Sequence, residues 1–262
     1  MAFKPTILGL LIYLAMAGYL LAFALFLFKK QKAASGSFLA GFLLAALGFI
    51  YRWEQTAHIP LQNLFEVFLC LGMLTYPLSA LGRRYLEAKR QTFDALLGFV
   101  ILFPAGLVFT AQPQKLPPAL QSWLFAPHVA AYMLAYVILF KGAILAGQQL
   151  LGRGQEADES VDYEKAVYTV VRVGFPLLTL GLILGAWWGK IAWGDYWNWD
   201  PKELWSLATW LVFVAYFHVR AVAGRRYPRL NCSLALTGAV FIVLTLVWVN
   251  LARFFTGLHS YA

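Results

Sequence analysis

The amino-acid sequence predicts an all-α, polytopic membrane protein, a bundle of about eight transmembrane helices with both termini outside. Three observations lead to this prediction. The 262 residues are 61% hydrophobic and 13% charged, whereas soluble domains are about 25% charged. Apolar runs long enough to cross ~30 Å of hydrocarbon recur along the chain. Because backbone polar groups in lipid must be satisfied internally, these runs are expected to be helices.

The predicted spans follow one another with short connections. The first span is followed by Lys29 and is longer than the apolar core of a signal peptide. In a signal peptide the positive charge would also stand before that core. The second is the least apolar, since its purely apolar part covers only 38–50, but residues 51–53 supply an interfacial end. The spans in order are about 6–28, 35–53, 61–81, 92–111, 128–151, 167–189, 204–223 and 230–251.

The net charge of +9 is interpreted as a topology signal and not as a sign of nucleic-acid binding. The Lys and Arg residues concentrate in alternate loops, and the positive-inside rule places those loops inside and both termini outside. The inner set comprises Lys29, Lys30, Lys32, Arg83, Arg84, Lys89, Arg90, Arg153, Lys165, Arg220, Arg225, Arg226 and Arg229. The outer set is smaller and comprises Lys4, Arg52, Lys115, Lys190, Lys202 and Arg253.

No linker is long enough to separate two domains, so residues 1–262 are predicted to form a single integral-membrane domain. Cys70 and Cys232 lie far apart in or beside apolar runs, without a Cys-x-x-Cys motif. This pattern argues against a disulfide framework, a zinc site and an iron–sulfur cluster.

Half of the 10 tryptophans lie between residues 187 and 199, in a predicted outer loop that continues to residue 205. An aromatic belt at the membrane interface is one interpretation. A belt is spread over many helix ends, however, whereas this cluster is dense, and Trp205 and Trp210 follow it closely. The cluster suits a large flat aromatic ligand that is partly apolar and partly anionic. Segment 187–205 is therefore the candidate ligand platform.

The segment Asp200-Pro201-Lys202-Glu203 predicts the start of a helix. Asp200 is a suitable N-cap, Pro201 suits the first helical position, and Glu203 at N3 would close a capping box. This structural role is sufficient to explain both acidic residues. It also places the positive end of a helix dipole beneath the tryptophan cluster.

The 4 histidines lie in different segments. His128 is at the outer end of predicted span 128–151, and His259 is in the outer C-terminal tail. Both are therefore expected on the same side of the membrane as the tryptophan cluster. His218 lies about 22 Å along its helix from Glu203, near the inner face, and His58 precedes the third span. A histidine near an interface is usually a polar cap, but imidazole also ligates haem iron. Two histidines from different segments could bind one iron from opposite faces.

Three ionisable residues fall within predicted spans. Glu66 shares a helix face with Gln62 and Asn63. Lys141 and Arg172 lie in the inner halves of their spans. Charges inside a span are expensive and mark function by default. One interpretation is a structural ion pair between Glu66 and a cation, although Glu66 should lie nearer the outer side of the membrane than either Lys141 or Arg172. The other is that Lys141 and Arg172 receive the propionate groups of a ligand arriving from the cytoplasm.

Several motifs together resemble a known family. The run Trp193-Gly194-x-Tyr196-Trp197-x-Trp199-Asp200-Pro201-Lys202-Glu203 is similar to the WWD signature of haem-handling proteins. The last four residues of this run, Asp200-Pro201-Lys202-Glu203, resemble the CcsA (ResC) branch of system II cytochrome c biogenesis. The resemblance extends to His58-Ile59-Pro60, to Gln62-Asn63-Leu64-Phe65-Glu66, to His128 and His218, and to the ending Gly257-Leu258-His259-Ser260-Tyr261.

The resemblance implies a cytochrome c haem lyase (synthase) subunit that acts with a ResB/CcsB-type partner. Haem b would be transported outward and attached to the Cys-x-x-Cys-His segment of apocytochrome c. His128 and His259 would be the catalytic pair and the axial ligands of haem held at the WWD surface, which includes Trp193, Trp197 and Trp199. His218 would belong to a transmembrane haem site whose second ligand comes from the partner, and His58 would have a structural or accessory role.

Three other functions share parts of these motifs. A CcmC-like exporter would deliver haem without ligating it, a scaffold or regulator would bind haem without turnover, and a quinone-linked b-type cytochrome would show reversible redox chemistry. The membrane is expected to be a bacterial plasma membrane or a thylakoid membrane, with the active face periplasmic or otherwise extracytoplasmic.

Overall fold

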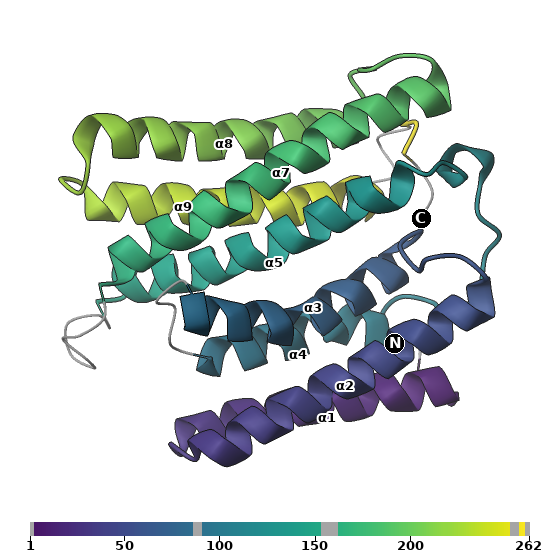
Figure 1. Ribbon diagram of the computed structural model, residues 1–262, viewed down its shortest axis with the longest axis horizontal. Helices are drawn as coiled ribbons and strands as arrows, with labels where there is room; N and C mark the ends of the chain where they lie inside the picture. The colour runs from purple at the N-terminus through teal and green to yellow at the C-terminus, as the bar shows by residue number, and fades with distance from the viewer. Residues whose placement is uncertain (1–2, 86–90, 153–161, 252–256, 260–262) are drawn as a thin grey trace. The chain divides into compact units, whose positions relative to one another are not determined.

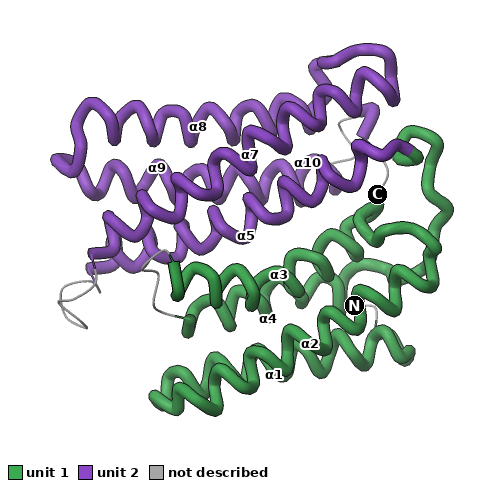
Figure 2. The backbone as a smooth tube through the Cα atoms, viewed as in Figure 1, with its two compact units in different colours: residues 1–121 green, residues 122–262 purple. Residues whose placement is uncertain are grey.

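The computed structural model describes residues 3–85, 91–152, 162–251 and 257–259 (Figure 1). No β-strand occurs in these ranges, which confirms the all-α class. The chain forms two compact units, residues 1–121 and 122–262 (Figure 2). Within these described ranges, seven helices are long and apolar enough to cross a membrane. Some residues named in the sequence analysis lie outside the described ranges, namely Lys89, Arg90, Arg153, Arg253, Ser260 and Tyr261.

The first unit is an antiparallel array of helices. Its elements are α1 (Ile7–Leu27), α2 (Gln31–Thr56), α3 (Leu64–Tyr85), α4 (Thr92–Leu107) and the 3₁₀ turn η1 (Pro118–Leu120). Helix α1 begins at Thr6, whose hydroxyl accepts a hydrogen bond from the Gly9 amide at 3.1 Å. Helices α1 and α2 approach closely where a Cβ on Gly18 would lie 3.1 Å from the Gly41 Cα, the small-residue packing common in membrane helices.

The second unit contains α7, which with 31 residues is the longest of the described helices. Its elements are α5 (Phe125–Leu150), α7 (Tyr163–Trp193), α8 (Pro201–Ala223), α9 (Pro228–Val243), the π-helical turn η2 (Leu244–Trp248) and α10 (Val249–Leu251). Helix α5 packs against α7, where a Cβ on Gly174 would lie 2.8 Å from the Leu139 side chain. The beginning of α5, the end of α7 and the beginning of α8 lie at the same end of this unit (Figure 1).

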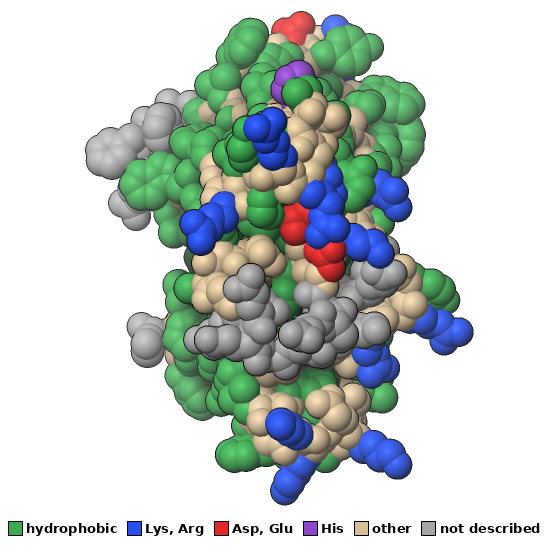
Figure 3. Space-filling view, turned by 90° about the vertical axis from the view of Figure 1, so that its left-hand side faces the viewer, with side chains coloured by type: hydrophobic (Ala, Val, Ile, Leu, Met, Phe, Trp, Pro, Cys, Tyr) green, Lys and Arg blue, Asp and Glu red, His purple; other side chains and the backbone are tan. Residues whose placement is uncertain are grey.

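The opposite end of the second unit is held by a cluster of charges. Glu164, buried in the first turn of α7, accepts hydrogen bonds from Arg225 Nε at 3.0 Å and from Asn231 Nδ2 at 2.9 Å. Arg225 also pairs with Asp162, the N-cap of α7. Figure 3 shows acidic and basic side chains beside one another on the face at this end. These pairs tie the start of α7 to the turn between α8 and α9.

The predicted spans correspond to the observed helices. Seven of them meet the length and hydropathy expected of a membrane helix, whereas predicted span 92–111 forms the shorter α4, which has 16 residues. The α4 helix ends after Leu107, three residues beyond Pro104. The placement of both termini outside and the single-domain organisation stay predictions.

Candidate haem-handling site

The tryptophan-rich segment is only partly a loop. Helix α7 continues through Trp193, so 187–193 of the predicted loop are helical. The helix ends at Gly194, whose φ of +92° is the left-handed conformation that favours glycine, and its amide donates to the Lys190 carbonyl at 3.2 Å. The loop proper is therefore short, and it displays its aromatic side chains between two helix ends.

The predicted helix start is confirmed. Asp200 is the N-cap of α8, its Oδ1 accepts a hydrogen bond from the Lys202 amide at 2.9 Å, and the capping box with Glu203 is complete. Glu203 Oε2 accepts from the Asp200 amide at 3.2 Å and from the Asn198 amide at 2.8 Å. Glu203 thus folds the loop back onto the beginning of α8.

Two large aromatic side chains of the loop are exposed. Tyr196 is 60% exposed and Trp199 is 67% exposed. Trp199 has a φ of +58°, a left-handed conformation that is strained for a bulky residue and that tends to occur at ligand sites. The Trp197 and Trp199 rings meet edge to face at 6.1 Å. The loop therefore presents aromatic surface at a cost in backbone energy.

A buried tryptophan that the motif analysis did not single out lies against both outer histidines. Trp188, only 2% exposed, stacks on the His128 ring at 5.8 Å between centroids with 13° between the planes. Its ring also contacts His259 at 5.6 Å and Trp193 at 4.7 Å, and His259 contacts Trp193 at 4.6 Å. The structure thus brings together His128 and His259, which are far apart in the sequence, around Trp188.

Glycines of α7 make room for His128. Its Nδ1 lies 2.8 Å from the carbonyl oxygen of Gly181. A Cβ on Gly185 would lie 2.6 Å from the His128 Cε1, so a larger residue there would displace the ring. The sequence signal for this arrangement is the spacing of four residues between Gly181 and Gly185, which places both on one face of α7.

Asp200 holds His259 and the residues before it. His259 Nδ1 lies 3.0 Å from Asp200 Oδ1, and the Leu258 amide donates to Asp200 Oδ2 at 2.6 Å. A Cβ on Gly257 would lie 2.3 Å from that same Oδ2, so the close approach requires glycine. Burial by itself would raise the pKa of Asp200, but the hydrogen bonds from His259, Lys202 and Leu258 outweigh it and lower the pKa to about 2. The carboxylate is therefore ionised at neutral pH.

His128 and His259 are both arranged in the way that metal-bound histidines are. A carbonyl oxygen and an ionised carboxylate only accept hydrogen bonds, so Nδ1 of His128 and of His259 is the donor. In a neutral imidazole, Nε2 then carries the lone pair that a metal needs. Histidine ligands commonly donate their other N–H to a carbonyl or carboxylate in this manner.

Two hydrogen-bond donors of the loop have no partner within the part of the chain that the structure describes. They are Trp197 Nε1 and Asn198 Nδ2, and both atoms are buried. Buried donors normally have a partner, so they suit a ligand that carries acceptor atoms. With the two imidazoles and the exposed rings, these donors fit a flat, partly anionic haem. Sequence reasoning missed Asn198, although its position between Trp197 and Trp199 is a signal.

The third predicted ligand, His218, lies in a separate cavity of the second unit. His218 is exposed on α8 at the edge of a cavity of about 590 Å³. The cavity is lined by Arg172, Phe175, Pro176, Trp210, Val214, Phe217 and His218. Arg172 thus shares a cavity with His218, whereas Lys141 is buried in α5 and is not among the lining residues.

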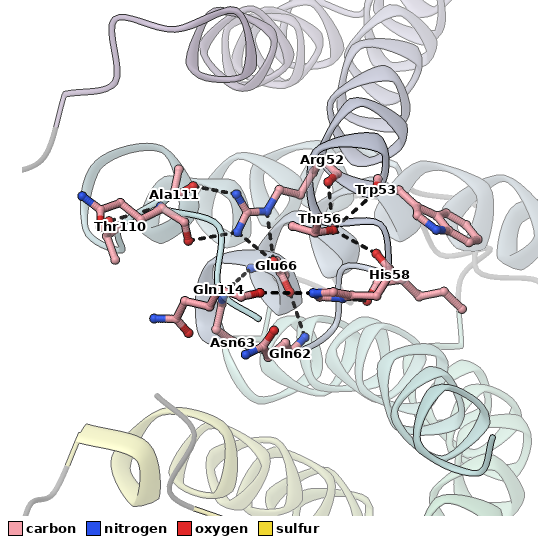
Figure 4. A network of polar contacts seen from close by, with 12 residues as sticks. Arg52, Trp53, Thr56, His58, Gln62, Asn63, Glu66, Thr110, Ala111 and Gln114 are labelled. Carbon is pink, nitrogen blue, oxygen red and sulfur yellow. Dashed lines mark hydrogen bonds and ion pairs between the residues drawn. The ribbon is translucent and has the colours of Figure 1, made fainter. Parts of the chain in front are cut away.

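Glu66 pairs with a cation of the first unit (Figure 4). Arg52 at the end of α2 donates through Nε to Glu66 Oε1 at 2.9 Å, and both side chains are almost completely buried. Arg52 Nη1 also donates to the Ala111 carbonyl at 2.6 Å, and Glu66 Oε2 accepts from the Gln62 amide at 2.9 Å. The structural ion-pair interpretation of Glu66 is thus the one that this geometry favours.

His58 lies at the edge of the same network (Figure 4). Its Nε2 is 3.4 Å from the Gln114 carbonyl oxygen, and its own carbonyl accepts from the Thr56 hydroxyl at 3.0 Å. These contacts connect the loop before α3 to the segment after α4. They are consistent with the structural role expected of His58.

Comparisons with known proteins assign the chain to a family. A family profile described as "Cytochrome C assembly protein" matches residues 5–256. The "Cytochrome c biogenesis protein CcsA" of Chlamydomonas reinhardtii is 34% identical over 84% of this chain and 65% of its own length. That of Synechococcus sp. (strain WH7803) is 33% identical over 84% and 82%. The chain thus spans slightly less than two thirds of the algal relative.

A solved structure has a similar fold. The "Cytochrome c Heme Lyase CcmF" superimposes with a TM-score of 0.70 at 20% identity, over 94% of this chain and 48% of that one. At this identity the likeness concerns the fold alone. The family profile covers nearly the whole chain, and the relatives that match at 30–35% identity carry the CcsA name. The chain therefore belongs to the cytochrome c assembly protein family, in its CcsA (ResC) group.

Proposed function

We propose that this protein presents haem b at the outer face of the membrane and attaches it covalently to apocytochrome c, together with a ResB/CcsB-type membrane protein. One observation supports the proposal above the others. His128 and His259 both contact Trp188, and the Nδ1–H group of each donates a hydrogen bond to an acceptor. This leaves Nε2 of each imidazole to bind haem iron.

The residues of this chain would bind and orient the substrate. Trp199 and Tyr196 offer exposed rings for the flat macrocycle, and Trp197 and Asn198 offer donors for its carboxylates. The incoming Cys-x-x-Cys-His segment would displace one histidine, and each thiol would add its S–H across a haem vinyl group to form a thioether. Holding the two substrates in this geometry is the principal contribution that the protein makes.

Haem would reach the outer site from the inner side. His218 supplies an imidazole and Arg172 a cation in one apolar cavity, a combination that suits iron and a propionate. The partner would supply the second ligand there. The membrane would be a bacterial plasma membrane or a thylakoid membrane, and ligation would take place on its extracytoplasmic face.

The experiment that tests the proposal is coexpression of the chain with a ResB-type partner and a c-type cytochrome reporter. We expect reporter with covalently bound haem, detected by haem staining after denaturing electrophoresis. Haem that is bound by the chain and delivered without any covalent product would instead favour the CcmC-like exporter. Haem that is bound but never delivered would favour a scaffold or regulator.

The inner cavity gives a separate expected result. In a chain that also carries His128→Ala and His259→Ala, so that only the inner cavity can bind haem, His218→Ala and Arg172→Gln should each lower the haem content measured with the partner by about 10-fold or more, since each removes a group that binds the ligand directly. Haem content is measured by pyridine haemochrome absorbance. Arg226→Gln is the matched control, because Arg226 is exposed and does not line the cavity. Unchanged haem content in both cavity variants would contradict an inner site at His218.

A further inference from the structure

We propose that the two outer histidines have unequal roles. His128 is the fixed ligand, and His259 is the exchangeable ligand, held in position by Asp200. This inference rests on the proposed function and deepens it, because it states which iron–nitrogen bond breaks when the histidine of apocytochrome c binds. The exchange itself breaks one iron–nitrogen bond and forms another, without change of oxidation state.

His128 is held from several sides by regular helices. It lies on α5, its Nδ1 is bonded to the Gly181 carbonyl of α7, and its ring occupies the space that Gly185 leaves open. The ring is further confined by Trp188 at 5.8 Å and by Tyr132 at 5.1 Å. For the His128 ring to move away from a bound haem iron, α5 and α7 would have to move apart, which would break a close-packed helix interface.

His259 lies outside the described helices and is held by ring contacts to Trp188 and Trp193 and by polar contacts to the first turn of α8. Asp200 binds both the Leu258 amide and His259 Nδ1, and Lys202 Nζ lies 3.5 Å from the His259 carbonyl oxygen. These contacts can break and re-form without unfolding any described helix. Because its release breaks hydrogen bonds and ring contacts but no helix interface, His259 is the histidine whose release costs less.

Asp200 is therefore a positioning residue for His259 as well as an N-cap. Its Oδ1 faces both the Lys202 amide at 2.9 Å and the imidazole at 3.0 Å, and Oδ2 holds the backbone of the preceding residue. The same carboxylate that begins α8 thus fixes the direction of the His259 Nε2. A purely structural cap would need only the contact to the helix amide.

The first measurement is the rate at which imidazole displaces the protein ligand from the ferric, haem-loaded chain, followed by stopped-flow absorbance. Asp200→Asn keeps an N-cap of equal quality but loses the charge that holds His259, so displacement from the haem-loaded fraction should become about 10-fold faster. Asp195→Asn is the matched control, because Asp195 is exposed in the same loop, and its rate should equal that of the wild type. An unchanged rate in Asp200→Asn would overturn the role of Asp200.

A second measurement does not depend on the Asp200 variants. In His259→Gly, added imidazole should restore the absorption spectrum of haem with two imidazole ligands, because no helix interface has to open at that position. In His128→Gly, imidazole should restore little, since the site is enclosed by α5 and α7. The opposite pattern would overturn the assignment of fixed and exchangeable ligands. A wild-type protein that lacks a two-histidine haem spectrum would instead contradict the proposed function itself.

Discussion

Replacement of both His128 and His259 by alanine is expected to reduce the haem held by the chain purified without its partner, whose inner site would lack a second ligand, below about one tenth of the wild-type level. Both histidines present Nε2 from rings that contact Trp188. Without either imidazole, the remaining aromatic surface could bind haem only through apolar contact and hydrogen bonds. The covalent c-type product in the coexpression assay should disappear with it. The measurement is a reduced-minus-oxidised spectrum with haem quantification, on the chain alone and with its partner.

His58→Ala is the matched control for this double variant. His58 belongs to the first unit, where it contacts only carbonyl oxygens and a hydroxyl group among the described residues. Haem content should therefore be unchanged in His58→Ala. If the His128/His259 double variant kept its full haem content, these residues would not be the ligands, and the outer site would have to lie elsewhere.

The second large effect is expected on stability, from Glu66→Ala. Removal of this carboxylate leaves the buried Arg52 guanidinium without its counter-charge, although the carbonyl oxygens of Ala111 and Gln112 still accept from it. Breaking a buried ion pair by removing one partner typically costs about 3–5 kcal/mol. The free energy of unfolding should fall by about that amount, measured by denaturant titration in detergent with tryptophan fluorescence.

Two further variants make this prediction specific. Glu54→Ala removes an exposed carboxylate of α2, the helix that carries Arg52, and should change the free energy of unfolding by less than about 0.5 kcal/mol. The double variant Arg52→Leu with Glu66→Leu should recover much of the loss, because no buried charge remains. Equal stabilities of Glu66→Ala and Glu54→Ala would show that the Arg52–Glu66 pair contributes nothing.

Features encoded locally could be predicted from the sequence. The apolar runs gave the helices because about 20 such residues must form a helix to satisfy their backbone in lipid. The helix start at Asp200 and Glu203 was predicted because a capping box involves residues only three positions apart. The extension of α7 to Trp193 was missed, since aromatic residues at an interface suit a loop and a helix end equally well.

The pairing of groups distant in the chain was decided only by the tertiary structure. Arg52 is the partner of Glu66 because α2 and α3 pack together, although the sequence had suggested an interfacial role for Arg52. The site itself depends on the same kind of packing. Two histidines on the outer side could be proposed from topology, but their contact with Trp188 and the bond between Asp200 and His259 require α5, α7, α8 and the tail to meet.

The sequence alone therefore determined the class of protein and the helices and indicated the candidate residues for binding haem, since these follow from composition and short-range spacing. The tertiary structure decided which nitrogen of each histidine donates a hydrogen bond, that the His128 ring lies between α5 and α7, and that His259 is bonded to Asp200 at the start of α8. These properties depend on close approaches such as those of Gly185 and Gly257, and no local pattern in the chain specifies what will occupy the space that a glycine leaves.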